Sequence, residues 1–200
     1  MKLYDILRSE FTNHENVIRG ENEVFVTDLV TCPVKREFYE IRGADSALIH
    51  GVAVHNAVES VLVKYGCEPE VSVFLQVPER GVLIRGRVDL LCPGNHVVEI
   101  KTSSKVNLEH VVQLFIYKYI LNASRASLVY LSTSTLAVYD LVGNKLCNEV
   151  TGSCEDLPIT LNYDLILSLV DHYLKGLRTP QFSQCSSCFF RSQCPLLLPS

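Results

Sequence analysis

The chain has 200 residues, of which 48% are hydrophobic, and its formal net charge is −4. This length and composition indicate one domain with a hydrophobic core and exclude a disordered chain. The charge excludes a uniformly basic nucleic-acid-binding protein, although a local basic channel remains compatible with it. No apolar run is long enough for a membrane helix and the start does not resemble a signal peptide, so we expect no membrane contact and a cytoplasmic location.

The first part of the chain predicts two helices around a short extended piece. Hydrophobic spacing predicts an amphipathic helix from Leu3 to about Phe11, followed by an extended piece at Val24–Val26. Thr27 is a suitable helix cap. A further helix is predicted from Pro33 to Ile41, with Gly43 closing it.

The clearest helix is predicted at Ser46–Tyr65, where apolar residues recur at helical spacing and Gly66 follows. This helix carries two histidines, His50 and His55. They are five positions apart, so they do not share one face of the helix. A single histidine is more often a structural residue than a metal ligand, and each is therefore a weak candidate when taken alone.

Alternating patterns then predict a three-stranded antiparallel meander at Val71–Val77, Val82–Leu91 and Val97–Lys101. A helix is predicted at Asn107–Leu121, and two further strands and a final helix are predicted at Ser127–Ser132, Leu136–Val142 and Asn162–Leu177. Residues 147–158 are predicted to be a loop. This order of elements predicts an α+β or mixed α/β fold with a central sheet covered by helices.

The middle hairpin contains a candidate metal site. Alternation places Glu99 and Lys101 on one face of their strand, and Asp89 on the neighbouring strand can reach the same point. Two converging carboxylates raise each other's pKa, and a divalent cation removes that conflict. Asp, then Glu-x-Lys, therefore predicts metal-dependent hydrolysis. The alternative on these three residues alone is an amphipathic hairpin whose charges face water.

The tail of the chain contains a second candidate metal site. Three of the eight cysteines in the sequence lie there, in the pattern Cys185-x2-Cys188-x5-Cys194. Zinc and iron–sulfur sites normally need four ligands, and Cys32 is a good fourth candidate at the start of a predicted helix. The spacing alone leaves zinc and an iron–sulfur cluster equally supported. The remaining cysteines lie alone in apolar or loop segments and are interpreted as structural: Cys67, Cys92, Cys147 and Cys154.

Several motifs in one order resemble the RecB-type nuclease superfamily, which has a restriction-endonuclease-like fold. In this sequence they are His55, Gly86–Asp89, Glu99–Lys101 and Gln113–Tyr117. Gly51-x-x-x-His55 also matches the helix motif of that superfamily, which favours His55 over His50. With Cys32 and the cysteine tail included, the chain is most similar to the CRISPR-associated iron–sulfur exonuclease family, the fourth of the numbered CRISPR-associated proteins. The resemblance extends from about Val24 to Pro195.

The resemblance implies a single nuclease domain over 1–200, with a core at about 44–178 and an iron–sulfur part made by 24–43 and 179–200. It implies Mn²⁺ or Mg²⁺ held by His55, Asp89, Glu99 and the carbonyl of Ile100. It implies that the catalytic residues are Lys101, Asp89, Glu99, Gln113 and Tyr117. It also implies an iron–sulfur cluster on Cys32, Cys185, Cys188 and Cys194, of the 4Fe–4S type in the family, with 2Fe–2S as the alternative.

The activity implied is hydrolysis of single-stranded DNA from a free end, which serves trimming of DNA before its integration into a CRISPR array. The implied partners are single-stranded DNA and the CRISPR integrase proteins, and an oligomer is compatible with this role. Three alternatives stay open: a stand-alone repair or recombination nuclease, a non-catalytic iron–sulfur protein that binds DNA or senses redox state, and a zinc-stabilised structural protein.

Overall fold

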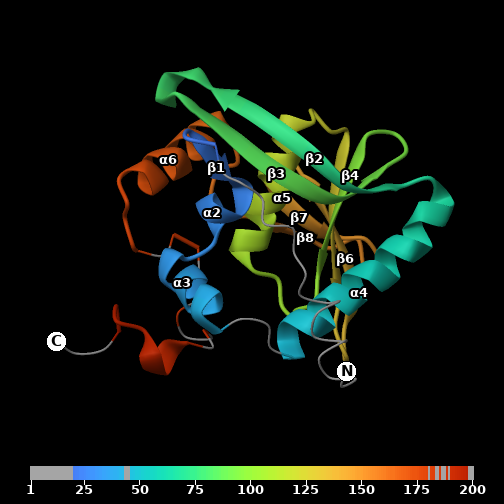
Figure 1. Ribbon diagram of the computed structural model, residues 1–200. Helices are drawn as coiled ribbons and strands as arrows, with labels where there is room; N and C mark the ends of the chain where they lie inside the picture. Colours follow the sequence, from blue (N-terminus) through green and yellow to red (C-terminus); the bar gives the residue numbers. More distant parts are fainter. Residues whose placement is uncertain are drawn as a thin grey trace, which may run out of the picture.

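An eight-stranded mixed sheet organises the described part of the chain in this computed structural model (Figure 1). The structure describes residues 20–42, 46–179, 181–182, 185, 188 and 190–197. The predicted helix at Leu3–Phe11 and the closing Gly43 lie outside these residues. In chain order the strands are β1 (Glu23–Phe25), β2 (Glu68–Val77), β3 (Val82–Cys92), β4 (His96–Lys101), β5 (Arg125–Leu131), β6 (Leu136–Val142), β7 (Lys145–Asn148) and β8 (Cys154–Asp156).

Five α-helices are described around this sheet: α2 (Val26–Val30), α3 (Pro33–Arg42), α4 (Ser46–Leu62), α5 (Leu108–Ile120) and α6 (Tyr163–Leu174). Short 3₁₀ helices cover Val63–Tyr65, Pro78–Arg80 and Arg191–Gln193. The predicted α+β class with a mixed sheet flanked by helices is therefore confirmed.

Strand β3 has a different neighbour at each end, and this positions the candidate site. Strand β2 pairs antiparallel along nearly its whole length. On the other side, β1 pairs in parallel with Leu83–Arg85, whereas β4 pairs antiparallel with Leu90–Cys92. Residues 86–89 of β3 therefore have no ladder partner on that side. Beyond β4 the sheet continues through β5, β6, β7 and β8.

Helix α5 forms the centre of the main hydrophobic core. The side chain of Asn107 caps it by accepting a hydrogen bond from the amide of Glu109 at 3.2 Å. Five of its apolar side chains are buried against the sheet and against α2 and α6: Val111, Val112, Leu114, Phe115 and Ile116. Each such burial stabilises the fold by about 1.5–3 kcal/mol.

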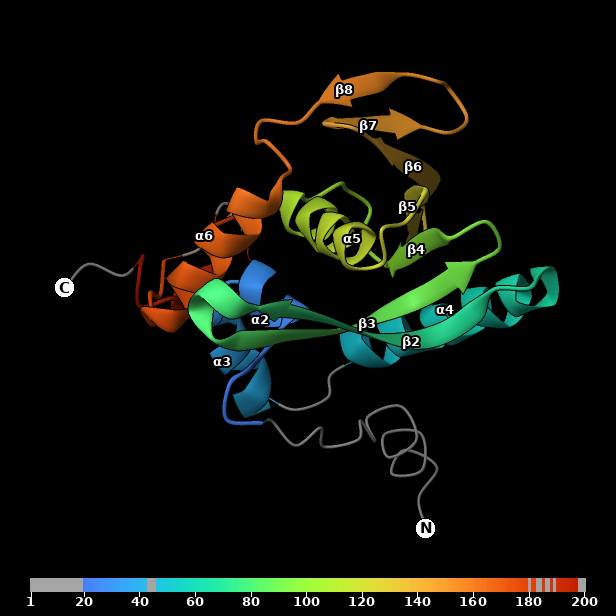
Figure 2. The same cartoon turned by 90° about the horizontal axis from the view of Figure 1, so that it is seen from above.

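Helix α4 lies on the opposite side of the β3–β4 region from α5 (Figure 2). It packs through Val58 and Leu62 onto a smaller cluster that contains Leu90, Val98 and Ile100. Gly66 ends this segment in the left-handed conformation (φ 86°), as the sequence predicted. The β3–β4 hairpin is therefore covered by α5 on one face and by α4 on the other.

The meander, the two long helices and the strands at β5 and β6 are confirmed within one or two residues at most ends. Two details differ. Residues 147–158 are not wholly a loop, because they contain the end of β7 and all of β8, which form a small antiparallel pair. Thr27 is not the helix cap, since α2 begins after Phe25, whose amide donates to the carboxylate of Asp28 at 3.1 Å.

Four cysteines that the sequence left unpaired are joined in two disulfides, which corrects the interpretation that each lies alone. Cys67 is bonded to Cys92, and Cys147 is bonded to Cys154. Both bonds join residues opposite each other at the ends of antiparallel strand pairs, where side chains are close neighbours. The pairing depends on strand register, which is why cysteine spacing did not reveal it.

Within the described ranges, no helix combines the length and the apolar character that crossing a lipid bilayer requires.

Candidate active site

The candidate site lies at the gap in the β3 ladder. Leu90 pairs with Val98, but the next residues in register, Asp89 and Glu99, are not joined as a ladder pair. Instead Oδ2 of Asp89 accepts a hydrogen bond from the main-chain amide of Ile100 at 2.6 Å. A side chain thus takes the place of a strand carbonyl, and the Asp89 carboxylate is fixed beside Glu99.

Glu99 is a buried acid with one unsatisfied oxygen. It is 2% exposed, and its Oε1 accepts a hydrogen bond from Nζ of Lys101 at 2.8 Å. The other oxygen, Oε2, is buried and has no hydrogen-bond partner among the described residues. Burial raises the pKa of Glu99, and the negative charge of Asp89 raises it further. The main-chain amide of Asp89 is near enough to lower this pKa slightly, although it makes no well-formed hydrogen bond to Oε2.

A chain of hydrogen bonds fixes Lys101. Its Nζ donates to Oε1 of Gln113 at 2.9 Å as well as to Glu99. The amide nitrogen of Gln113 donates in turn to the hydroxyl of Tyr117 at 3.4 Å. Both α5 residues are buried, and burial raises the pKa of Tyr117 far above its ordinary value. Gln113 and Tyr117 therefore position Lys101 and do not themselves face the open side of the site.

Gly86 provides the space that Tyr117 occupies. A Cβ atom at Gly86 would lie 2.4 Å from a ring carbon of Tyr117 and 2.9 Å from a methyl of Val26. Such distances are shorter than real carbon contacts, so only glycine allows the ring to lie against β3. The glycine of the predicted Gly86–Asp89 motif is thus explained by packing.

His55 is brought to the site, whereas His50 is exposed on α4. Nδ1 of His55 lies 3.6 Å from Oδ2 of Asp89, and the imidazole is 29% exposed. This selects the same histidine that the sequence motif favoured.

Glu59 is a site residue that the sequence reasoning missed. It follows His55 by one helical turn, and its Oε1 is buried without a hydrogen-bond partner among the described residues. Burial raises its pKa to about 6, with further contributions from Glu70 and Asp89. Glu70 stands opposite Asp89 on β2 with a left-handed φ of 57° and forms an ion pair with Arg87. The His-x-x-x-Glu spacing was the available signal.

The residues present suit a hard divalent cation. The described residues contain no group of three side chains already arranged as a complete ligand set. The donors nevertheless include an imidazole, the Asp89 carboxylate and a buried carboxylate oxygen with nothing to neutralise it. Mn²⁺ and Mg²⁺ favour oxygen donors, and an imidazole suits Mn²⁺. The ligand roles of His55, Asp89, Glu99 and the Ile100 carbonyl remain predictions that this chemistry supports.

The four predicted cluster cysteines line one cavity, together with residues of α3 and of the segment 190–197. Figure 1 shows α3 near this C-terminal segment. The cysteines that line the cavity are Cys32, Cys185, Cys188 and Cys194. Lys35 and Arg191 also line it, and Phe38 stacks on Phe190 at its side with ring centroids 5.0 Å apart. Four free thiols near two cations suit thiolate ligation. The division of the chain into a core and an iron–sulfur part remains a prediction.

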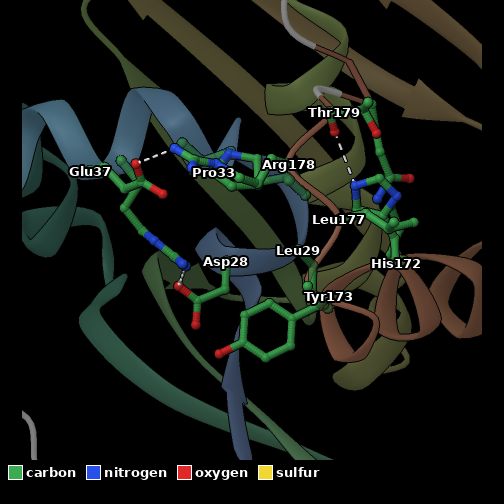
Figure 3. A pocket seen from close by; sticks show the side chains of 15 residues that line it. Asp28, Leu29, Pro33, Glu37, His172, Tyr173, Leu177, Arg178 and Thr179 are labelled. Carbon is green, nitrogen blue, oxygen red and sulfur yellow. Dashed lines mark hydrogen bonds and ion pairs between the residues drawn. The ribbon is translucent and has the colours of Figure 1, made fainter. Parts of the chain in front are cut away.

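The larger described cavity, about 280 Å³, lies elsewhere, between α2, α3 and the end of α6 (Figure 3). Its charged groups pair with each other: Asp28 with Arg36, and Glu37 with Arg178 at 2.6 Å. His172 contacts the carbonyl of Thr179 at 3.0 Å. We assign the chemistry to the β3–β4 gap, because the unsatisfied buried acids are there and this cavity offers balanced ion pairs.

Comparison with known proteins identifies the family of this chain. Residues 50–195 match the profile of the PD-(D/E)XK nuclease superfamily. The CRISPR-associated exonuclease Cas4 of Saccharolobus solfataricus is 28% identical over 213 residues, which cover 96% of this chain and 97% of that protein. The crystal structure of SSO0001 is similar with a TM-score of 0.76 and 25% identity, covering 100% of this chain and 99% of the other.

Proposed function

The chain belongs to the PD-(D/E)XK nuclease superfamily, and on that premise we propose that it is a metal-dependent DNA exonuclease that acts on single-stranded DNA ends. One observation carries the proposal. A fully buried glutamate, Glu99, keeps one oxygen unsatisfied beside Asp89, while its other oxygen is bonded to a lysine. An unpaired buried acid is unfavourable, and a cation between the carboxylates removes the penalty.

His55, Asp89, Glu99 and the carbonyl of Ile100 would hold Mn²⁺ or Mg²⁺. When bound, such an ion supplies activation of water at neutral pH and neutralises charge on the scissile phosphate. The hydrogen bond from Ile100 to Asp89 fixes one carboxylate, and the bond from Lys101 to Glu99 orients the other. These two bonds orient the carboxylates, and the ligand set would be completed when the ion binds.

Lys101 would hold the attacking water or stabilise the charge that develops on the phosphate. Its side chain is 15% exposed, and hydrogen bonds to Glu99 and Gln113 orient its ammonium group. Tyr117 fixes the amide of Gln113 so that the carbonyl oxygen faces Lys101. Gln113 and Tyr117 are thus positioning residues for the lysine. The intact set weighs against a non-catalytic relative, which would be free to lose one of these residues.

The four cavity cysteines would hold an iron–sulfur cluster, 4Fe–4S or 2Fe–2S, that fastens the C-terminal tail to the start of α3. Its role in this proposal is structural, and no electron transfer is required for hydrolysis.

The full-length similarity to a CRISPR-associated exonuclease supports a place in CRISPR adaptation. In that role the protein trims single-stranded ends before integration, works with the integrase proteins in the cytoplasm, and has DNA as its substrate.

The test is cleavage of end-labelled single-stranded DNA with Mn²⁺, comparing the wild type with Asp89→Ala and Glu99→Gln. We expect cleavage by the wild type alone, and none after chelation of the metal. The control is Asp164→Ala, which removes an exposed acid from the first turn of α6 and should cut like the wild type. Equal cleavage by Asp89→Ala would refute the site. A folded, inactive wild type that still binds DNA would refute the nuclease assignment.

A further inference from the structure

The described side chains of helix α4 bury little apolar surface against the sheet. It carries His55, yet none of its described side chains, residues 49–62, is fully buried. Helix α5, by contrast, has eight buried residues. Among the described side chains of α4, only Val58 and Leu62 pack on the small cluster beneath it, and Val61 at its C-terminal end is 50% exposed. Apolar burial alone therefore anchors α4 weakly.

A covalent bond anchors the end of this segment. Cys67 follows the 3₁₀ turn that ends α4, and its amide donates to the carbonyl of Leu62 at 3.3 Å. Its sulfur is bonded to Cys92, the last residue of β3. A Cβ on Gly66 would lie 3.3 Å from Pro93, so the segment also rests against the turn after β3. Strand β2 begins at the residue after Cys67, and its Glu68 pairs with Leu91 of β3. The disulfide and this ladder together fix the helix end to the strand that carries Asp89.

The distances make this anchor relevant to the metal site. His55 lies roughly 10 Å along α4 from Leu62, at about 1.5 Å per residue. Asp89 lies about 10 Å along β3 from Cys92, at about 3.3 Å per residue. The bond therefore joins the two elements at similar distances from the two side chains, which approach each other to 3.6 Å. The ladder between β2 and β3 holds this end of α4 as well, so loss of the bond should loosen the helix and not free it.

We propose that the Cys67–Cys92 disulfide positions His55 against Asp89, and that its reduction weakens metal binding. This inference rests on the proposed function for the metal site at His55 and Asp89. In the reduction a dithiol supplies two electrons and two protons, the S–S bond breaks to two thiols, and the dithiol closes to its own disulfide.

The chain contains a matched control. The Cys147–Cys154 disulfide also joins an antiparallel strand pair, but it lies in β7–β8, at the far end of the sheet from α4 (Figure 2). Loss of this second bond changes local stability without touching the helix that carries His55.

The experiment compares the wild type, Cys67→Ala/Cys92→Ala and Cys147→Ala/Cys154→Ala, each with its cluster intact. Two quantities are measured: Mn²⁺ binding, from the electron paramagnetic resonance signal of free Mn²⁺, and hydrogen exchange of the α4 amides in metal-free protein. We expect about tenfold weaker Mn²⁺ binding and faster α4 exchange in the first variant, as for loss of a supporting contact around a metal. The second variant should match the wild type in both.

Dithiothreitol would break both disulfides of the wild type, so the same measurements are made on Cys147→Ala/Cys154→Ala before and after dithiothreitol. This breaks the Cys67–Cys92 bond without removing its atoms, and it serves if the first variant does not fold. Equal Mn²⁺ binding and equal α4 exchange with and without the Cys67–Cys92 bond would overturn the inference. A wild type that neither binds Mn²⁺ nor cuts DNA would overturn the proposed function instead. The α4 exchange in metal-free protein would still show whether the disulfide anchors the helix.

Discussion

Gly86→Ala tests the link between packing and catalysis most directly. The added methyl would lie 2.4 Å from the Tyr117 ring and 2.9 Å from a Val26 methyl. Neither side chain can move away easily. The Tyr117 ring is rigid, 2% exposed and hydrogen-bonded to Gln113, and Val26 is fully buried. Residue 86 cannot move away either, because β3 is paired with β2 along its length. Overpacking of this kind costs about 1–3 kcal/mol, and two contacts below 3.0 Å place this case near about 3 kcal/mol.

Relief of the clash requires a shift of about 1 Å in Tyr117, which displaces Gln113 and then Lys101. A 1 Å misplacement of a catalytic group lowers the rate by about 100-fold. The assays are urea unfolding and single-turnover DNA cleavage at a temperature where the variant is folded. Gly51→Ala is the control, because its Cβ would meet nothing nearer than 3.8 Å. It should be neutral or slightly stabilising in α4. A Gly86→Ala protein as stable and as fast as the wild type would refute the reasoning.

Three further predictions concern pH, the cysteine cavity and the remote disulfide. The pKa of Glu59 is raised from 4.5 to about 6, so the folded state binds this proton more tightly than the unfolded chain does. The free energy of unfolding of the metal-free protein should therefore fall as pH rises from about 4.5 through about 6. Urea unfolding of Glu59→Gln at the same pH values should not show this fall. A variant that loses as much stability as the wild type would contradict the raised pKa of Glu59. Cys188→Ala should lose the visible absorption of the cluster together with stability and activity, and a coloured variant of normal stability would contradict a ligand role. Removal of the Cys147–Cys154 bond, whose cysteines are 7 residues apart, should lower the free energy of unfolding by about 2 kcal/mol with cleavage unchanged; a large loss of cleavage would show that β7–β8 serves the site.

The site was predictable from sequence where one element decides the geometry. Alternation along β4 placed Glu99 and Lys101 on one face, and in the structure Lys101 donates hydrogen bonds to Glu99 and to Gln113 of α5. Ile100, between them in sequence, packs toward α4. The one-turn spacing of Gln113 and Tyr117 likewise predicted their shared face. These arguments need only the period of a strand or a helix.

Features that depend on two elements could not be predicted. The carboxylate of Asp89 replaces a ladder partner only because β1 and β4 pair with different ends of β3. Glu59 enters the site because α4 lies over that gap. The short strands β7 and β8 span only four and three residues, too few for a clear alternating pattern. In each case the missing information is which segments lie side by side.

The cysteine cavity also affects the order in which contacts form as this protein folds. Cys32 is far in sequence from the three tail cysteines that share its cavity. Strands β2 to β8 and helices α3 to α6 lie between them. Contacts between such distant segments close late in folding, because the loop between them is long. A chain cut before Cys194 would contain His55, Asp89, Glu99 and Lys101 and would lack one of the four thiols that line the cavity.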